Sequence, residues 1–433
     1  MIRGTRVVAP EGVRPACVVV DRGRIAAIDS HDDVRAGHVL DVGDLVVMPG
    51  LVDTHVHVNE PGRTEWEGFA SATRAAAAGG ITTILDMPLN AIPATTTVAA
   101  LEAKRRSALE SAVINVEFIG GVVPGNTAEI EPLAKAGVRA FKCFLSPSGV
   151  EEFLNVTEAD LRDAFPELAR TGLPLMVHAE DPAHLVTPTG DPCDYACYLA
   201  SRPVAAEHAA IELLVRLVEW CETPVHIVHL SSATSLPIIH AARARGLPIT
   251  VETCPHYLTF TAEEIASRAT EFKCAPPIRE AAERDALWRG LMEGEIDLVA
   301  SDHSPCPPSM KGTSGDFFAA WGGIASLQLS LAAVWTGARL RGMSFARMAQ
   351  WMSEAPARLA GLHPRKGVLA AGGDADIMVW NPDEEFVVDR GALLHRHAVT
   401  PYAGRTLCGV VHATFVAGRC VFNSLPAPMR DLE

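Results

Sequence analysis

The 433-residue sequence lacks the features that mark several classes of protein. Its ten cysteines are scattered without a Cys-x-x-Cys pair, so we expect reduced thiols in the cytoplasm rather than a disulfide framework. No basic run occurs and the formal net charge is −15, which argues against nucleic acid as a partner. Apolar stretches such as residues 329–335 are too short to span a membrane, and the chain opens without a signal-peptide pattern.

Two catalytic motifs are also missing. No Gly-x-Ser-x-Gly occurs, and no serine or cysteine stands out beside a histidine, so a serine or cysteine hydrolase is not expected. No Gly-x-Gly-x-x-Gly follows the first strand of the central region, which removes the best reason to expect an open dinucleotide-binding sheet. What is present is a hydrophobic content of 48% with 21% charged residues, a composition typical of a soluble globular protein with a large core.

Both ends of the chain are rich in short β-strand patterns. Residues 17–21 and 24–28 predict a hairpin that turns at Arg22 and Gly23, and residues 45–48 predict a further strand. Near the other end, residues 375–380, 409–416 and 418–422 have the same character. Neither end could bury much core alone. We therefore expect residues 1–49 and 365–433 to form one small β-sandwich beside a domain of residues 50–364.

In the central region, apolar strands alternate with amphipathic helices. The predicted strands are residues 51–58, 81–85, 113–119, 140–145, 174–178, 225–230, 249–253 and 296–300. Helical patterns lie between them, for example at residues 67–78, 97–109, 158–171, 205–221 and 235–245. This alternation predicts an α/β fold with a parallel sheet, and eight strands are the number that closes a (β/α)8 TIM-like barrel. An open doubly wound sheet is the alternative.

Polar side chains stand within or at the ends of several of these apolar strands. His55 and His57 are two residues apart, so both imidazoles can point to the same side of a strand. Similar positions are held by Lys142, His178, His226, His229, Asp302 and His303. The carboxyl ends of barrel strands are where active sites are built, and neutral imidazole is a preferred ligand of zinc. Because unpaired buried polar groups are costly, the pattern predicts a metal site rather than packing.

Lys142 needs a separate explanation, because a lysine among metal ligands would place one cation beside others. The conflict disappears if the amine is neutral or has added carbon dioxide to become a carbamate anion. Such a group has two oxygens and can bridge two metal ions about 3.5–4 Å apart.

Several segments resemble the cyclic amidohydrolases, a branch of the amidohydrolase superfamily that includes dihydroorotase, hydantoinase and allantoinase. They are Pro-Gly-Leu-Val-Asp-Thr-His-Val-His at residues 49–57, Phe-Lys-Cys-Phe at 141–144, Val-His-Ala-Glu at 177–180, Val-His-Leu-Ser-Ser at 228–232 and Ser-Asp-His-Ser-Pro at 301–305. The resemblance extends to residues 372–380, near the C-terminus. It implies a (β/α)8 barrel, a small β-sandwich built from both termini, and a two-metal centre bridged by a carboxylated lysine.

Position by position, the resemblance implies a role for each candidate. His55 and His57 match the ligands of the more buried metal, and His178 and His229 match those of the second. Lys142 matches the bridging N6-carboxylysine. Asp302 matches the aspartate that completes the first metal's ligand set and acts as the general acid/base. Supporting positions around the ligands are expected for His226, His256 and His303. Two zinc ions are expected per chain, with manganese, cobalt, nickel and iron as alternatives.

Within this branch the sequence resembles the allantoinases. Asn59 stands where dihydroorotases place an arginine for the substrate carboxylate, so dihydroorotate is not the expected substrate. Residues 59–69, 144–150, 273–279 and 320–328 resemble allantoinase segments. Substrate contacts are therefore expected at Asn59, Ala275, Ser304, Trp321 and Gly322.

The expected reaction is hydrolysis of the cyclic amide of allantoin to allantoate, in purine and ureide catabolism. A hydantoinase or dihydropyrimidinase activity is the alternative, and a non-catalytic scaffold related to the hydantoinases is a remote one. The resemblance also implies a homo-oligomer, a tetramer or a dimer, that acts on a small molecule.

Overall fold

The central region forms a parallel β-barrel. The computed structural model describes residues 1–33, 38–425 and 432. One sheet contains eight strands that lie side by side in sequence order: β6 (Leu51–Val56), β7 (Ile81–Asp86), β8 (Asn115–Gly121), β9 (Ala140–Phe144), β10 (Leu175–His178), β11 (Val225–Ile227), β12 (Ile249–Thr253) and β13 (Leu298–Val299). Their ladders are all parallel. Strands in this order, joined by helices, are the unit of a (β/α)8 barrel.

The segment that follows β13 closes the ring. His303 forms parallel bridges with Val56 at the end of β6 and with Ile324. The amide of His57 also donates to the carbonyl of His303 at 2.8 Å. The last strand segment is thereby joined to the first, and the predicted barrel fold is confirmed.

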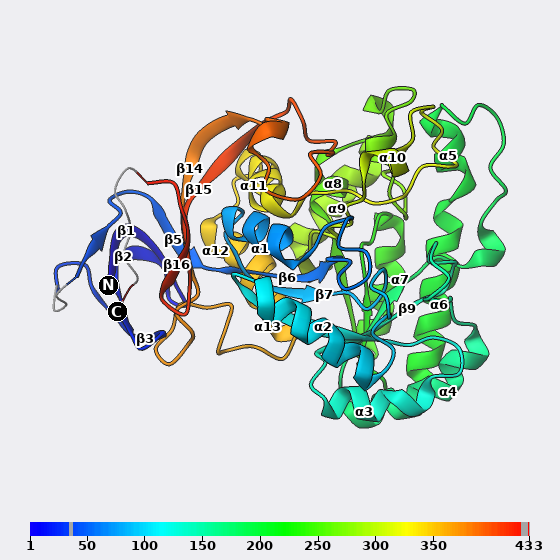
Figure 1. Cartoon of the computed structure of the whole chain (residues 1–433), viewed down its shortest axis with the longest axis horizontal. Coiled ribbons are helices and arrows are strands. Elements are labelled where there is room, and N and C mark those ends of the chain that lie inside the picture. The colour runs from blue at the N-terminus through cyan, green and yellow to red at the C-terminus, as the bar shows by residue number, and fades with distance from the viewer. Residues whose placement is uncertain (34–37, 426–431, 433) are drawn as a thin grey trace.

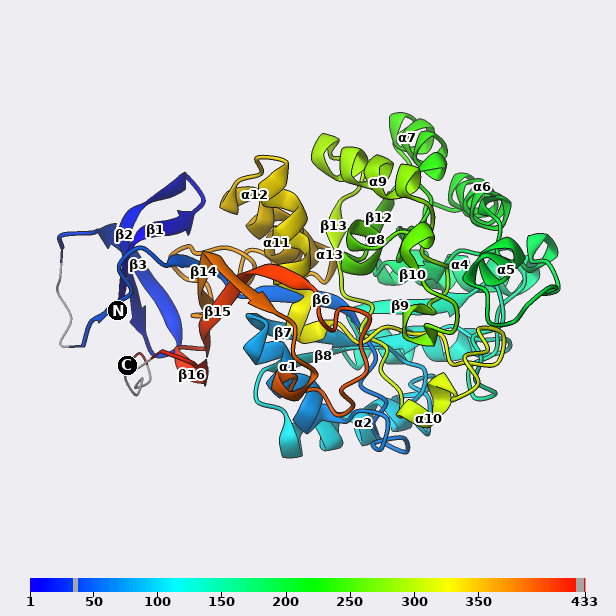
Figure 2. The ribbon, with the colours of Figure 1, turned by 90° about the horizontal axis from the view of Figure 1, so that it is seen from above.

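Helices surround the barrel (Figures 1 and 2). Local sequence sets their ends: α4 begins at a capping box of Thr157 and Asp160 and stops at Gly172, whose φ of 68° suits glycine. The helices are α1 (Phe69–Ala78), α2 (Val98–Ser111), α3 (Ile130–Lys135), α4 (Glu158–Thr171), α5 (Tyr195–Ser201), α6 (Val204–Trp220), α7 (Leu236–Ala244), α8 (Pro255–Thr259), α9 (Ala281–Glu293), α10 (Pro308–Lys311), α11 (Ser330–Leu340), α12 (Phe345–Ala349) and α13 (Ala355–Leu359). Within the described part of the chain, no helix combines the length and apolar character needed to cross a lipid bilayer.

The two ends of the chain share a second, mixed sheet, seen at the left of Figure 2. Its strands are β1 (Ile2–Ala9), β2 (Gly12–Asp21), β3 (Arg24–Ser30), β4 (Leu40–Asp41), β5 (Val46–Pro49), β14 (Ile377–Val387), β15 (Thr406–Val416) and β16 (Arg419–Asn423). β5 pairs with β14 in antiparallel register and joins the two ends. Arg22 and Gly23, both at positive φ, make the predicted hairpin turn. This terminal sheet agrees with the predicted fold class. The domain boundaries stay a prediction. Residues 34–37, 426–431 and 433 of the two end segments lie outside the described residues.

The observed elements differ from the predicted ones mainly where functional loops begin. The strand predicted at residues 296–300 is reduced to Leu298–Val299, because the chain then leaves the ladder to place Asp302. The helix predicted from residue 67 begins at Phe69 instead. Glu67 is fully buried outside the helix and accepts a hydrogen bond from the amide of Arg396 at 3.0 Å. Tertiary contacts, rather than local periodicity, decide both ends.

Candidate metal centre

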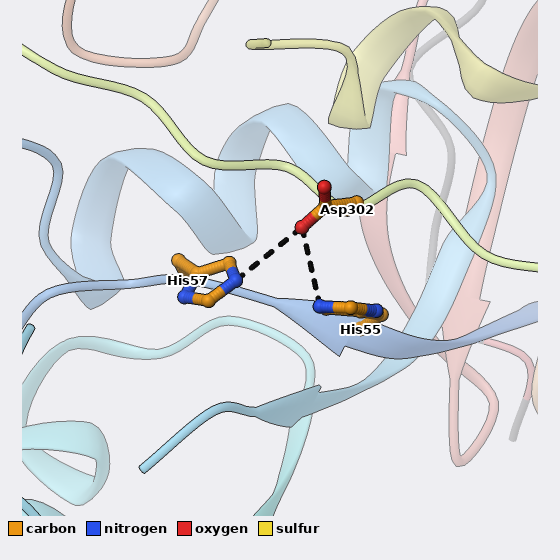
Figure 3. Close-up of side chains that lie close together, drawn as sticks. All are labelled: His55, His57 and Asp302. Carbon is orange, nitrogen blue, oxygen red and sulfur yellow. Dashed lines mark ion pairs between the residues drawn. The ribbon is translucent and has the colours of Figure 1, made fainter. Parts of the chain in front are cut away.

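His55, His57 and Asp302 meet at the carboxyl end of the barrel (Figure 3). His55 lies in β6, His57 directly follows that strand, and Asp302 lies in the loop after β13. The Nε2 atoms of the two histidines are 3.2 and 3.3 Å from Oδ1 of Asp302. All three side chains are buried, and their donor atoms lie close enough together to surround a single metal ion.

His178 and His229 form a second cluster beside the first. His178 ends β10 and His229 follows β11, and Nδ1 of His178 lies 3.0 Å from Nε2 of His229. The ring centroid of His229 is 5.4 Å from that of His55, so the two clusters adjoin. Burial lowers the pKa of both His178 and His229, which keeps these imidazoles neutral and suited to bind a metal.

Lys142 lies near both clusters, because its charge interacts with Asp302 of the first and with His178 of the second. It belongs to β9, is fully buried, and its Nζ has no hydrogen-bond partner among the described residues. Nζ lies 4.8 Å from the ring centroid of Phe144, which itself stacks on His178. Burial lowers the pKa of Lys142 to about 8, although the charge of Asp302 opposes the change. A buried, unpaired amine with a lowered pKa can react with carbon dioxide, so the environment of Lys142 is consistent with the predicted carbamate.

Two buried carboxylates that were not predicted from the sequence orient the ligand rings. Nδ1 of His55 donates to Glu252 at 2.6 Å, which leaves Nε2 facing Asp302. Nε2 of His178 donates to Glu180 at 2.6 Å, which leaves Nδ1 facing His229. Each carboxylate therefore fixes which nitrogen is free for a metal. Burial alone would raise the pKa of Glu252, but the neighbouring charges of His55 and His226 lower it to about 2.

The backbone is strained at two of the ligands. His229 has a φ of 42° and Asp302 a φ of 46°, in the left-handed region that residues other than glycine rarely adopt. Such positions cost about 1–3 kcal/mol each and persist only where the surrounding structure holds them. At Asp302, the neighbouring residues are held by the bond from the amide of Ser301 to Asp53 (3.1 Å) and by the strand bridges of His303.

The three histidines predicted to support the ligands lie in different environments. His226 donates from Nε2 to Glu252 at 3.0 Å and therefore helps to hold the carboxylate that orients His55. His303 accepts at Nδ1 from the amides of Ser326 and Leu327. His256 is fully buried, and neither of its ring nitrogens has a hydrogen-bond partner among the described residues.

A cavity of about 790 Å³ opens onto the ligands. His55, His57, His178, His229 and Asp302 line its floor. Of the five residues predicted to contact substrate, four line the cavity: Ala275, Ser304, Trp321 and Gly322. Asn59 does not. Its buried side chain donates to the carbonyl of Pro305 at 3.4 Å instead.

Two lysines hold one wall of the cavity. Nζ of Lys311 donates to the carbonyls of Trp321 at 2.9 Å and Gly323 at 2.6 Å. Nζ of Lys273 donates to the carbonyls of Phe318 and Ala320. Four carbonyls of one loop thus face cationic donors rather than the cavity.

A model of the amidohydrolase family matches residues 46–421. The chain belongs to the amidohydrolase family. This amidohydrolase is 54% identical over 421 residues to an allantoinase from Streptomyces avermitilis, covering 96% of this chain and 94% of the relative. It is 44% identical over 444 residues to an allantoinase from Arabidopsis thaliana, covering 98% and 88%. The predicted placement in the cyclic amidohydrolase branch, and with it the prediction of an enzyme, is confirmed.

Solved structures show the same fold. An L-hydantoinase (dihydropyrimidinase) from Arthrobacter aurescens matches this amidohydrolase with a TM-score of 0.93 and 32% identity, covering 100% of this chain and 97% of the other. A D-hydantoinase from a Bacillus species matches with a TM-score of 0.89 and 26% identity, covering 98% and 95%. The barrel and the terminal sheet are therefore family features.

Proposed function

We propose that the protein is an allantoinase, which hydrolyses the cyclic amide of allantoin to allantoate in purine and ureide catabolism. One observation carries the proposal: four buried histidines and one aspartate converge beside an unpaired buried lysine at the floor of a cavity. The substrate follows from the relatives named allantoinase, at 54% and 44% identity over nearly the whole chain.

A hydantoinase or dihydropyrimidinase activity is the second candidate, because solved structures bearing those names share the fold. The identity to these proteins is lower, at 32% and 26%. A non-catalytic scaffold is a third reading, but it predicts a broken ligand set, whereas every predicted ligand position is filled here.

The residues present fit two divalent metal ions. His55, His57 and Asp302 would hold the first, His178 and His229 the second, and Lys142, once carboxylated, would bridge them. The imidazole-rich set suits zinc, and elemental analysis distinguishes it from manganese, cobalt, nickel and iron. Bound divalent ions would polarise the ring carbonyl and lower the pKa of water to near neutrality.

Asp302 supplies the proton transfers in this proposal. Burial opposes its charge, yet His55 and His57 hold the pKa of this carboxyl well below its usual range, so it is ionised and has a free site for a proton. It would take a proton from the attacking water and give that proton to the ring nitrogen as the carbon–nitrogen bond breaks. The new carboxylic acid releases the second proton of the water to solvent, so the product is a carboxylate with an open-chain nitrogen, and atoms and charge balance.

The cavity wall would hold the ureide by main-chain donors. Ala275 and Gly322 line the cavity, and their main-chain amides donate no hydrogen bond to any of the described residues. Neutral substrate carbonyls accept from such donors without a counter-charge, which suits allantoin better than an anionic ring. The lysines at positions 273 and 311 keep this wall in place.

We further propose a cytoplasmic homo-oligomer, a tetramer or a dimer. All ten cysteines are free in the structure, which suits a reducing compartment. One relative, from Aquarana catesbeiana, is named as a mitochondrial allantoinase, so cell fractionation is the appropriate check of compartment. Light scattering of the purified protein measures the assembly.

A substrate panel tests the proposed function. Purified enzyme is assayed on allantoin, hydantoin, dihydrouracil and dihydroorotate under identical conditions. We expect the highest kcat/KM for allantoin. A higher value for dihydrouracil or hydantoin would overturn the substrate assignment, and no turnover of any of the four would favour the scaffold.

A further inference from the structure

Behind the second cluster lies a network of buried ion pairs, of which only Glu180 has so far been given a role. Its members are Glu180, Arg202, Glu207, Ser231 and Arg279. Glu180 is fully buried, Glu207 is 2% exposed and Arg279 is 5% exposed. Charges so deeply buried are costly unless they are paired in good geometry. Their placement directly behind His178 and His229 calls for an explanation.

One arm of the network ends at His178. Arg202, which follows α5, donates from Nε and Nη2 to the two oxygens of Glu180 at 2.9 and 2.5 Å. Glu180 in turn accepts from Nε2 of His178 at 2.6 Å. Burial opposes the charge of Glu180, but Arg202 and His178 lower its pKa to about 2. The pair therefore fixes the ring of His178 with Nδ1 toward the cavity.

The other arm ends beside His229. Glu207, in α6, accepts from the amides of Ser231 at 3.1 Å and Ser232 at 3.3 Å and from the hydroxyl of Ser231 at 2.7 Å. These residues follow the strained backbone of His229 by two and three positions. On the other side, the amide of His229 donates to Glu252 at 3.3 Å. Hydrogen bonds to Glu207 and Glu252 thus hold the strained turn on both sides.

Arg279 joins the two arms. Its Nε and Nη2 form an ion pair with Glu207, its Nε also donates to the hydroxyl of Ser231 at 2.9 Å, and its Nη1 donates to the carbonyl of Arg202 at 3.2 Å. Only a planar guanidinium offers donors in three fixed directions. α5 and α6, which carry the two arms, lie next to each other outside the barrel (Figure 2).

We propose that Arg279 is a positioning residue that sets the geometry of His178 and His229 together, and so determines the affinity of the second metal subsite alone. This inference rests on the proposed two-metal function. His55 is oriented by Glu252 and His57 lies against Asp302, and Arg279 forms no direct hydrogen bond or ion pair with any of these four residues within the described part of the chain. Disturbing Arg279 should therefore separate the two subsites.

The test is Arg279→Lys, which keeps the charge but cannot serve both arms. Orienting partners typically contribute 10- to 100-fold to metal affinity, so we expect the second ion to bind about 10- to 100-fold more weakly. After dialysis against a graded chelator, the variant should retain about one ion where the native enzyme retains two. With cobalt(II) in place of the native metal, its absorption spectrum should match that of His178→Ala and not that of His57→Ala.

Arg243→Lys is the matched control. Arg243 also serves several partners, the carbonyls of Ile249 and Glu295 and the carboxylate of Asp297, but these lie at the amino ends of β12 and β13, opposite the metal centre. We expect this variant to keep both ions. If Arg279→Lys does not fold, Arg202→Lys, at the partly exposed end of the network, is expected to give the same selective loss.

Two outcomes would overturn the inference: Arg279→Lys retains both ions with native affinity, or Arg279→Lys loses both ions to the same extent. The proposed function is judged separately. A native enzyme that binds two ions but does not hydrolyse allantoin leaves the inference standing and removes the substrate assignment.

Discussion

Carbon dioxide should be required to rebuild the metal centre from metal-free enzyme. The pKa of Lys142 should set how the rate of this reactivation depends on pH. Carbamate formation needs the neutral amine, and burial lowers the pKa of Lys142 from 10.5 to about 8. At pH 7 about one-tenth of such an amine is neutral, against roughly 0.03% for an ordinary lysine. The fold therefore increases the reactive form about 300-fold. The nitrogen then bonds to carbon dioxide and releases one proton.

The measurement uses enzyme stripped of metal and carbon dioxide, then given metal at a constant concentration of dissolved carbon dioxide. The rate at which activity returns should rise about ninefold from pH 6 to 7 and about fivefold from pH 7 to 8, and should level off above about pH 9. Enzyme rebuilt with carbon-13-labelled carbon dioxide should show a carbamate NMR signal that is absent in Lys142→Ala. Formate or acetate should restore part of the activity of that variant. Reactivation that needs no carbon dioxide, or a rate that does not change between pH 6 and 8, would refute the reasoning.

Three substitutions test the other roles assigned by the structure. Asp302→Asn removes the proposed proton carrier, so kcat for allantoin should fall by about 10²- to 10⁴-fold, and a fall of less than tenfold would exclude that role. Glu252→Gln releases the ring of His55, so metal affinity measured against a chelator should drop about 10- to 100-fold. The control Glu117→Gln alters the ion pair with Arg139 on the outside of β8 and should leave the metal affinity unchanged. Lys311→Met removes the hydrogen-bond donors to the loop at the cavity wall, so KM for allantoin should rise about tenfold while metal content stays unchanged. The control is Lys135→Met, at an exposed lysine. Equal KM values for the two variants would show that the loop does not need Lys311.

Much of the fold could be predicted because its signals are local. Each barrel strand is a short apolar run between helical patterns, and the positions of His55 and His57 at the end of such a run are visible in sequence. The strand at residues 296–300 was overestimated because hydrophobicity does not reveal that the chain must leave the ladder before Asp302. The register of the terminal sheet depends on pairing between β5 and β14, more than 300 residues apart, which periodicity cannot give.

The residues that orient the ligands could not be placed from sequence for the same reason. Arg279 and Glu207 lie 72 positions apart, and His55 and Glu252 lie 197 apart. One usable signal was present: Glu252 is the only ionisable residue of the strand Ile249–Thr253, and a carboxylate in such a position must be paired when buried. For Asn59 the substrate contact stays a prediction, and in the structure its side chain donates to the carbonyl of Pro305.

Titration of the metal-free enzyme with zinc, in the presence of carbon dioxide, tests the central claim most directly. Activity on allantoin should rise until about two ions are bound per chain and should then remain constant, with elemental analysis confirming the stoichiometry. Full activity in a preparation that contains no metal would contradict the account.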